Sequence, residues 1–163
     1  MAGGSTPAIR ALIRAGADHQ VHTYEHDPRS DSYGTEAVDA LVARLGVDAA
    51  QIFKTLVLEL STGSLAVAVL PVPHSLSLKA AAAALGVPKA AMADRVKAER
   101  STGYVLGGIS PLGQRKQLPT VLDASALEWD RMLCSAGRRG MEIELAPADL
   151  IRLTAAVTAS IAV

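Results

Sequence analysis

Two apolar stretches separated by a short polar turn constrain the fold of this chain more than any other feature. Residues 52–60 (IFKTLVLEL) and 65–71 (LAVAVLP) have the composition of strands, and residues 61–64 (STGS) between them are typical of a turn. We therefore expect a β-hairpin. Because apolar residues occupy successive positions and not only alternate ones, both faces of this hairpin should be buried.

Helix and strand patterns flank the hairpin on both sides. Caps, prolines and closing glycines predict helices over residues 7–15, 35–45, 78–85 and 95–101, and from residue 147 onwards. Further strands are expected at 20–26, 89–93, 118–122, 132–135 and 141–145. Because strands and helices alternate irregularly around tight hairpins, we expect an α/β domain with a mixed sheet and not a doubly wound parallel one. All of residues 1–163 are expected to form that one domain.

Composition narrows the kinds of protein that remain. Half of the 163 residues are apolar but only 3% are aromatic, so the core must consist of Ala, Val, Leu and Ile. The 16 basic and 16 acidic residues balance, which argues against a protein that grips long nucleic acid, such as DNA, by charge. A short RNA end remains possible. Cys134 is the one cysteine, so no internal disulfide forms. We see no signal peptide and no membrane helix, and expect a cytoplasmic protein.

A glycine-rich segment at residues 100–113 (RSTGYVLGGISPLG) is the first candidate for a site. Its centre, Gly107, Gly108, Ile109, Ser110 and Pro111, has no side chain suited to acid or base chemistry, so it offers mainly backbone. Successive N–H groups in such a turn bind an oxyanion, a carbonyl or a phosphate. The segment matches neither a P-loop nor a G-x-G-x-x-G pattern. On residues alone, a plain surface turn is as good an interpretation as an anion cradle.

Lys54 is the second candidate, because it interrupts the otherwise apolar strand of residues 52–58. A lysine in a central strand is costly to bury unless it is paired or reaches a cavity. The alternative is an edge-strand lysine that discourages aggregation. We favour the functional interpretation slightly.

Three other motifs have ordinary explanations. His22 and His26 match the letters of an H-x-x-E-H zinc motif, but in a strand they lie about 13 Å apart, too far to share a metal, so we expect no metal and no cofactor. Cys134 lies in an apolar strand and is better read as a small buried residue than as a nucleophile. Arg138 and Arg139 form a hairpin tip that is either a solvated turn or a phosphate contact.

Taken together, these segments resemble the YbaK/EbsC family, in particular its YbaK branch of Cys-tRNA(Pro) deacylases. The resemblance extends from about Thr6 to Ile151. It rests on T-P-A near the start, H-T-Y-E-H-D-P from His22, F-K-T-L from Phe53, M-A-D from Met92, the glycine-rich segment and L-P-T from Leu118. The H-T-Y-E-H-D-P sequence favours the YbaK branch over the alanine-specific relatives.

The resemblance implies a compact mixed α/β domain with a barrel-like sheet and surrounding helices. In the family, the lysine at position 54 anchors the 3′-terminal adenosine of tRNA, and Gly107 and Gly108 present main-chain donors to the aminoacyl carbonyl. Tyr24 and Tyr33 would line the pocket, although relatives often carry Phe at the second position. The resemblance places further substrate-binding residues in the glycine-rich segment and on the closing strands. These are Ile109, Ser110, Pro111, Ser135 and Glu142, the last in place of the family's usual Asp.

The implied activity is trans-editing: hydrolysis of cysteine mischarged onto tRNA(Pro). The family mechanism lets the thiol of the substrate attack its own ester carbonyl, while the protein orients it and stabilises the oxyanion. The implied partners are the tRNA(Pro) acceptor end and prolyl-tRNA synthetase. Two alternatives remain open: a deacylase of mischarged alanine or serine that uses a bound water, and a non-catalytic module that binds a tRNA end or a synthetase.

Overall fold

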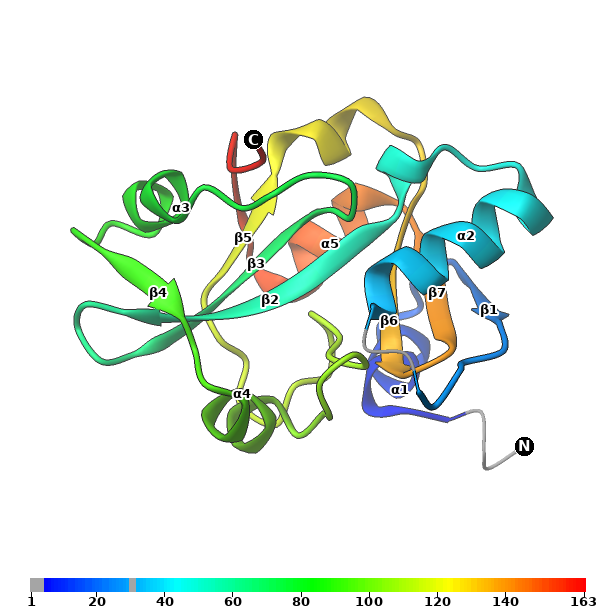
Figure 1. The fold of residues 1–163 in the computed structure, drawn as a ribbon, viewed down its shortest axis with the longest axis horizontal. Coiled ribbons are helices and arrows are strands. Elements are labelled where there is room, and N and C mark those ends of the chain that lie inside the picture. Colours follow the sequence, from blue (N-terminus) through cyan, green and yellow to red (C-terminus); the bar gives the residue numbers. More distant parts are fainter. Residues whose placement is uncertain (1–4, 30–31) are drawn as a thin grey trace.

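The computed structural model describes residues 5–29 and 32–163, which form an α/β structure with two sheets (Figure 1). The helices are α1 (Pro7–Ala15), α2 (Tyr33–Leu45), α3 (Leu78–Ala84), α4 (Arg95–Thr102) and α5 (Pro147–Thr154), with short 3-10 segments η2 (Ala49–Gln51) and η3 (Ala124–Glu128). The strands are β1 (His19–Thr23), β2 (Phe53–Leu60), β3 (Leu65–Pro71), β4 (Ala90–Met92), β5 (Thr120–Asp123), β6 (Met132–Arg138), β7 (Met141–Leu145) and β8 (Val157–Ala159).

The predicted hairpin is the centre of the larger sheet. Strands β2 and β3 pair antiparallel from Phe53↔Pro71 to Glu59↔Leu65. Alternate residues of the hairpin belong to different apolar clusters: Val67 and Val69 pack in one, with α1, α5 and the small sheet, whereas Ala68 packs in the other, with α3. Both faces are therefore covered, as the continuous apolar pattern predicts.

The expectation of a mixed arrangement is confirmed. The larger sheet has the order β4-β2-β3-β5-β8, in which β5 runs parallel to both β3 and β8 and the other pairs are antiparallel. The smaller sheet, β1-β7-β6, is antiparallel.

The barrel-like closure is not seen in the part of the chain that the structure describes. Among residues 5–29 and 32–163, an isolated bridge joins the two sheets, between Ile52 just before β2 and Leu133 on β6. No pairing joins the outer strands β1, β4 and β8 to one another. Strand β8 was not expected, because its three residues carry too short a pattern to be recognised.

Local signals locate the helices well. Thr6 caps α1 by accepting a hydrogen bond from Ile9 N–H, and Gly16 ends the helix with φ 66°. Ser77 and Asp94 cap α3 and α4 in the same way. One detail was wrong: α2 begins at Tyr33 and not at residue 35. No helix of residues 5–29 and 32–163 combines the length and the apolar character needed to cross a bilayer.

Helix α2 and the glycine-rich segment lie on either side of the first residues of β2. Leu41 of α2 packs against Ile52 and Leu133, so the helix covers the junction of the two sheets (Figure 1). The glycine-rich segment begins in the last turn of α4 and contributes Ile109 and Leu112 to the main core. This arrangement leaves a cavity between α2, β2 and the loop.

Candidate functional site

A cavity of about 360 Å³ opens where α2, β2, the glycine-rich segment and the smaller sheet meet. This volume lies in the range of small-molecule sites. Its lining residues are Tyr24, Ser32, Tyr33, Gly34, Thr35, Ala37, Phe53, Lys54, Thr55, Leu56, Val72, Leu106, Gly107, Ile109, Ser135 and Glu142. Seven of the ten residues expected from the sequence line it: Tyr24, Tyr33, Lys54, Gly107, Ile109, Ser135 and Glu142. Gly108, Ser110 and Pro111 do not.

Lys54 is held in place by backbone carbonyls. Its Nζ donates to the carbonyl oxygen of His74 at 2.6 Å and to that of Val72 at 3.3 Å. Burial lowers the pKa of this ammonium group from its usual value. The strand is paired with β3 at this point, whereas β4 joins it only at Leu58–Leu60. Lys54 therefore supplies a fixed, partly desolvated cation beside an open strand edge that faces the cavity.

Thr55, which sequence analysis missed, is the next residue along this edge. Its Oγ1 is buried and has no hydrogen-bond partner within the described part of the chain. A buried hydroxyl without a partner costs about 1–3 kcal/mol, so such groups in native structures call for an explanation. Other atoms of Thr55 line the cavity, so a rotation of the side chain would bring this hydroxyl to a bound polar group. Its place in the F-K-T-L sequence, next to Lys54, was the signal that could have indicated it.

The glycine-rich segment places Gly107 and Gly108 in different roles. Gly107 lines the cavity with φ 88°, and a Cβ there would lie 2.6 Å from the ring of Tyr33. Gly108 N–H donates to the carbonyl oxygen of Val105 at 2.9 Å, and a Cβ there would meet the backbone of Arg139 at 2.9 Å. The expectation that both glycines present free donors is thus wrong for Gly108, whose N–H closes the turn.

Ser110 and Pro111 shape the loop from the inside. Both are buried, and Ser110 Oγ accepts the N–H of Leu112 at 3.2 Å while its carbonyl accepts Gln114 Nε2 at 3.1 Å. The expected contact of these two residues with a ligand is not supported by this arrangement. Ser110 stabilises the turn through these hydrogen bonds, because buried polar groups are paired within the protein.

Ser135 and Glu142 are cross-strand partners on β6 and β7. Glu142 is only 6% exposed, and burial raises the pKa of its carboxyl to about 8. Ser135 Oγ accepts the N–H of Gly137 at 3.1 Å, next to the irregularity of β6. At neutral pH Glu142 is therefore mostly a neutral carboxylic acid, which can both donate and accept a hydrogen bond.

Tyr24 follows β1 and stands close to this carboxyl. Its N–H donates to the carbonyl oxygen of Gly140 at 2.9 Å, which ties the end of β1 to the β6–β7 turn. Burial, and then the nearby Glu142, raise the pKa of its phenol. Tyr24 is thus a neutral hydrogen-bonding group on the cavity wall.

Cys134 lies outside the cavity, as the interpretation as a buried residue predicts. Its side chain is fully buried in the main core. Burial, with a smaller contribution from Glu142, raises the pKa of its thiol well above the ordinary value. Because the thiolate is the reactive form, this thiol is inert at neutral pH.

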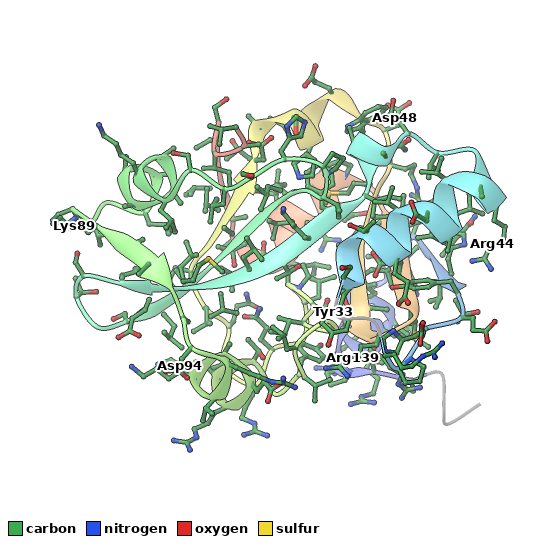
Figure 2. All side chains as sticks on the ribbon, in the orientation of Figure 1. Tyr33, Arg44, Asp48, Lys89, Asp94 and Arg139 are labelled. Atoms are coloured by element: carbon green, nitrogen blue, oxygen red, sulfur yellow. The ribbon has the colours of Figure 1, made fainter. Side chains whose placement is uncertain are left out.

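The rim of the cavity carries aromatic and charged side chains. The guanidinium of Arg139 lies 4.7 Å from the centre of the Tyr33 ring, and these two labelled residues are neighbours in Figure 2. His26 contacts the same ring at 5.8 Å between centroids and hydrogen-bonds Glu36 at 2.7 Å. His22 instead pairs with Glu144 at 2.9 Å, so the two histidines of the H-x-x-E-H sequence have separate carboxylate partners.

The described lining residues thus offer one ammonium, one neutral carboxyl, several hydroxyls and the backbone of the glycine-rich segment. Histidine and cysteine are absent from this set. Residues 5–29 and 32–163 hold no cluster of three or more His, Cys, Asp or Glu side chains that could bind a metal ion. These groups can bind and orient a polar ligand and stabilise a developing oxyanion.

The chain is similar to three known proteins in sequence or in fold. A proposed Cys-tRNA(Pro)/Cys-tRNA(Cys) deacylase of Enterococcus faecalis, EbsC, is 40% identical over 94% of this chain and 93% of that protein. A crystal structure of a proposed trans-editing enzyme for prolyl-tRNA synthetase is 25% identical, with a TM-score of 0.81 over 98% of both chains. A hypothetical protein of known structure, 23% identical, shares the fold with a TM-score of 0.82 over 97% of this chain and 100% of that one.

The family model named the aminoacyl-tRNA editing domain matches residues 34–153. This range contains the greater part of the cavity, from the first turn of α2 to the closing strands β6 and β7. The chain therefore belongs to the aminoacyl-tRNA editing domain family.

Proposed function

We propose that this protein is a trans-editing deacylase that removes cysteine mischarged onto tRNA(Pro). The observation that carries the proposal is the pairing of the fixed Lys54 ammonium with the Gly107 backbone on the wall of one cavity. The name of the Enterococcus relative and that of the trans-editing structure support the same substrate class.

Lys54 anchors the 3′-terminal adenosine in this proposal. Two carbonyl contacts hold its Nζ, so little side-chain entropy is lost when a ligand binds. Thr55 Oγ1 takes a hydrogen bond from or to the ribose or base, which satisfies a group that is otherwise buried without a partner. Tyr24 and Tyr33 line the walls beside the aminoacyl group.

The aminoacyl ester lies with its carbonyl oxygen at Gly107 N–H, and its amino group and side chain at Ser135 and Glu142. The neutral Glu142 carboxyl accepts a hydrogen bond from the substrate amine or donates one to it. One preorganised donor at a developing oxyanion contributes about 3–4 kcal/mol to catalysis. Ile109 completes the apolar part of the wall.

The nucleophile in this proposal is the thiol of the substrate cysteine. Its sulfur bonds to the ester carbonyl carbon, the bond to the ribose oxygen breaks, and the thiol proton ends on that oxygen, which releases tRNA and a thiolactone that water then opens. The protein contributes orientation and oxyanion stabilisation. The buried, inert Cys134 has no part in these steps.

The partners in this proposal are the acceptor end of tRNA(Pro) and prolyl-tRNA synthetase, in the cytoplasm where charging takes place. The cavity is sized for a nucleoside with its amino acid and not for a duplex.

The test is the release of labelled cysteine from Cys-tRNA(Pro), with Ala-tRNA(Pro) and a Ser-tRNA side by side. Lys54→Ala should lower the rate at least tenfold. Lys89→Ala should not, because it removes an exposed lysine that lies far from Tyr33 of the cavity wall (Figure 2). Equal rates for wild type and Lys54→Ala would reject the role of Lys54. No turnover of the cysteinyl ester would reject the function, and efficient hydrolysis of the alanyl ester would reject obligatory attack by the substrate thiol.

A further inference from the structure

Two charged side chains hydrogen-bond the backbone of Leu106, the residue before Gly107. Gly107 lines the cavity. Glu99 of α4 accepts Leu106 N–H through Oε2 at 2.7 Å. Arg139, from the β6–β7 turn, donates through Nε to the Leu106 carbonyl oxygen at 2.8 Å. Both side chains come from outside the loop, so the rest of the fold fixes the orientation of this residue.

The contact of Arg139 with the Leu106 carbonyl has a direct consequence for Gly107. The C=O of Leu106 and the N–H of Gly107 belong to one planar trans peptide unit, in which the two bonds point in opposite directions. With the oxygen directed at the guanidinium, the Gly107 N–H must point away from Arg139. Among the described residues this N–H has no recorded hydrogen-bond partner, whereas the next one, of Gly108, is used by Val105.

Arg139 itself is held from several sides. Its guanidinium lies over the Tyr33 ring, and a Cβ at Gly107 would overlap the same ring. Its backbone N lies 2.9 Å from where a Cβ of Gly108 would stand, so the β6–β7 turn and the loop are in direct contact. Leaving this position would cost the guanidinium both its contact with the Tyr33 ring and its hydrogen bond to the loop.

We propose that Arg139 is a positioning residue, which orients and polarises the Leu106–Gly107 peptide so that Gly107 N–H serves as the oxyanion donor. A charge-assisted hydrogen bond to the carbonyl oxygen draws electron density from the peptide and makes its N–H a better donor. Arg139 thereby acts on the substrate through the backbone, without touching it. This inference rests on the proposed deacylase function.

Steady-state kinetics on Cys-tRNA(Pro) test this role. The proposed donor acts mainly in the transition state, so Arg139→Ala should lower kcat about tenfold or more while KM changes less than twofold. Added methylguanidinium should restore part of kcat in this variant, which it would not do for a general loss of structure. Arg152→Ala, which removes a guanidinium from α5 that pairs with Asp149, should match wild type. A rise in KM with unchanged kcat would overturn the proposal and indicate a phosphate contact.

NMR of the protein without substrate gives a readout that does not depend on activity. In Arg139→Ala the Leu106 carbonyl ¹³C and the Gly107 amide ¹H resonances should both move upfield, as expected when a hydrogen bond to the carbonyl is lost. Wild-type shifts for both would overturn the proposal, whatever the kinetics. If the wild type fails to release cysteine, the proposed function fails, while the NMR shifts still decide whether Arg139 sets the Leu106–Gly107 peptide.

Discussion

The polar side chains of the cavity are satisfied to very different degrees. Lys54 has two carbonyl acceptors, Glu142 keeps its proton because it is buried, and Thr55 has no partner among the described residues. A fold would not retain the last two for stability alone, because each costs free energy in the empty state. Residues of this kind concentrate at functional sites, where a ligand compensates them.

Replacing Thr55 by valine separates the effect of its hydroxyl on stability from its effect on ligand binding. Valine has the same shape without the unsatisfied hydroxyl, so the free energy of unfolding should stay equal or rise by about 1 kcal/mol. Turnover of Cys-tRNA(Pro) should show a higher KM, because a ligand contact is lost. The matched variant Thr154→Val removes a hydroxyl that bonds the Leu150 carbonyl at 2.7 Å, and should lose stability with unchanged kinetics. Urea unfolding and steady-state rates measure both, and a destabilised Thr55→Val would show that its hydroxyl already has a partner.

Glu142 makes stability depend on pH. Burial raises the pKa of its carboxyl from near 4.5 to about 8, so the native state keeps a proton that the unfolded chain has lost. The stabilisation is complete below the unfolded pKa and is lost as the pH rises through the native one. Glu142→Gln cannot ionise, so its stability relative to wild type should rise by several kcal/mol between pH 5 and 9. Urea unfolding of both proteins over this pH range measures the difference. Free energies of unfolding that change with pH in parallel for wild type and Glu142→Gln would refute the prediction.

Most helices and strands could be predicted from the sequence, because caps, turns and apolar patterns act within a few residues. The hairpin of β2 and β3 and the caps Thr6, Ser77 and Asp94 lie where the sequence predicts them. The start of α2 and the strand β8 were missed. The short β8 is a strand because it pairs with β5, a partner about 36 residues earlier that no local pattern reveals.

Helix α4 is one such locally determined element that also supports the site. It carries Glu99, which accepts Leu106 N–H, and leads into the glycine-rich segment. Asp94 caps it by accepting the N–H of Lys97 at 2.9 Å. Asp94→Ala should therefore lower the free energy of unfolding by about 1 kcal/mol. Asp39→Ala, at an exposed position within α2, provides the control and should change stability by less than about 0.5 kcal/mol. Chemical denaturation of the two variants compares them, and equal stabilities would contradict the capping role.

At the scale of the molecule, the sequence indicated a mixed α/β fold, which is seen. It also indicated a site between Lys54 and the glycine-rich segment; the structure has a cavity there, and its use as the site stays a prediction. The sequence could not indicate that two sheets meet at an isolated bridge, because that depends on how distant strands pack. Nor could it show that Gly108 N–H is used within the turn, or that Arg139 reaches the Leu106 carbonyl. That residues 1–163 form one domain stays a prediction.

The balanced charge of the whole chain has a consequence for binding. With 16 basic and 16 acidic residues, the chain has no net positive charge to drive association with tRNA. We expect weak affinity for tRNA(Pro) alone, a shallow salt dependence, and at least tenfold tighter binding when prolyl-tRNA synthetase is present. Filter binding between 50 and 200 mM salt, with and without the synthetase, measures these quantities. A steep salt dependence and tight binding without the synthetase would contradict this expectation.

The proposed function places deacylation of a cysteinyl ester in the cavity that has Lys54 on its wall. The most direct measurement is single-turnover release of labelled cysteine from Cys-tRNA(Pro) by wild type, Lys54→Ala and the control Lys89→Ala. We expect rapid release by wild type and Lys89→Ala, and a rate at least tenfold lower for Lys54→Ala. Release by Lys54→Ala at the wild-type rate, or no release by any of the three proteins, would contradict this expectation.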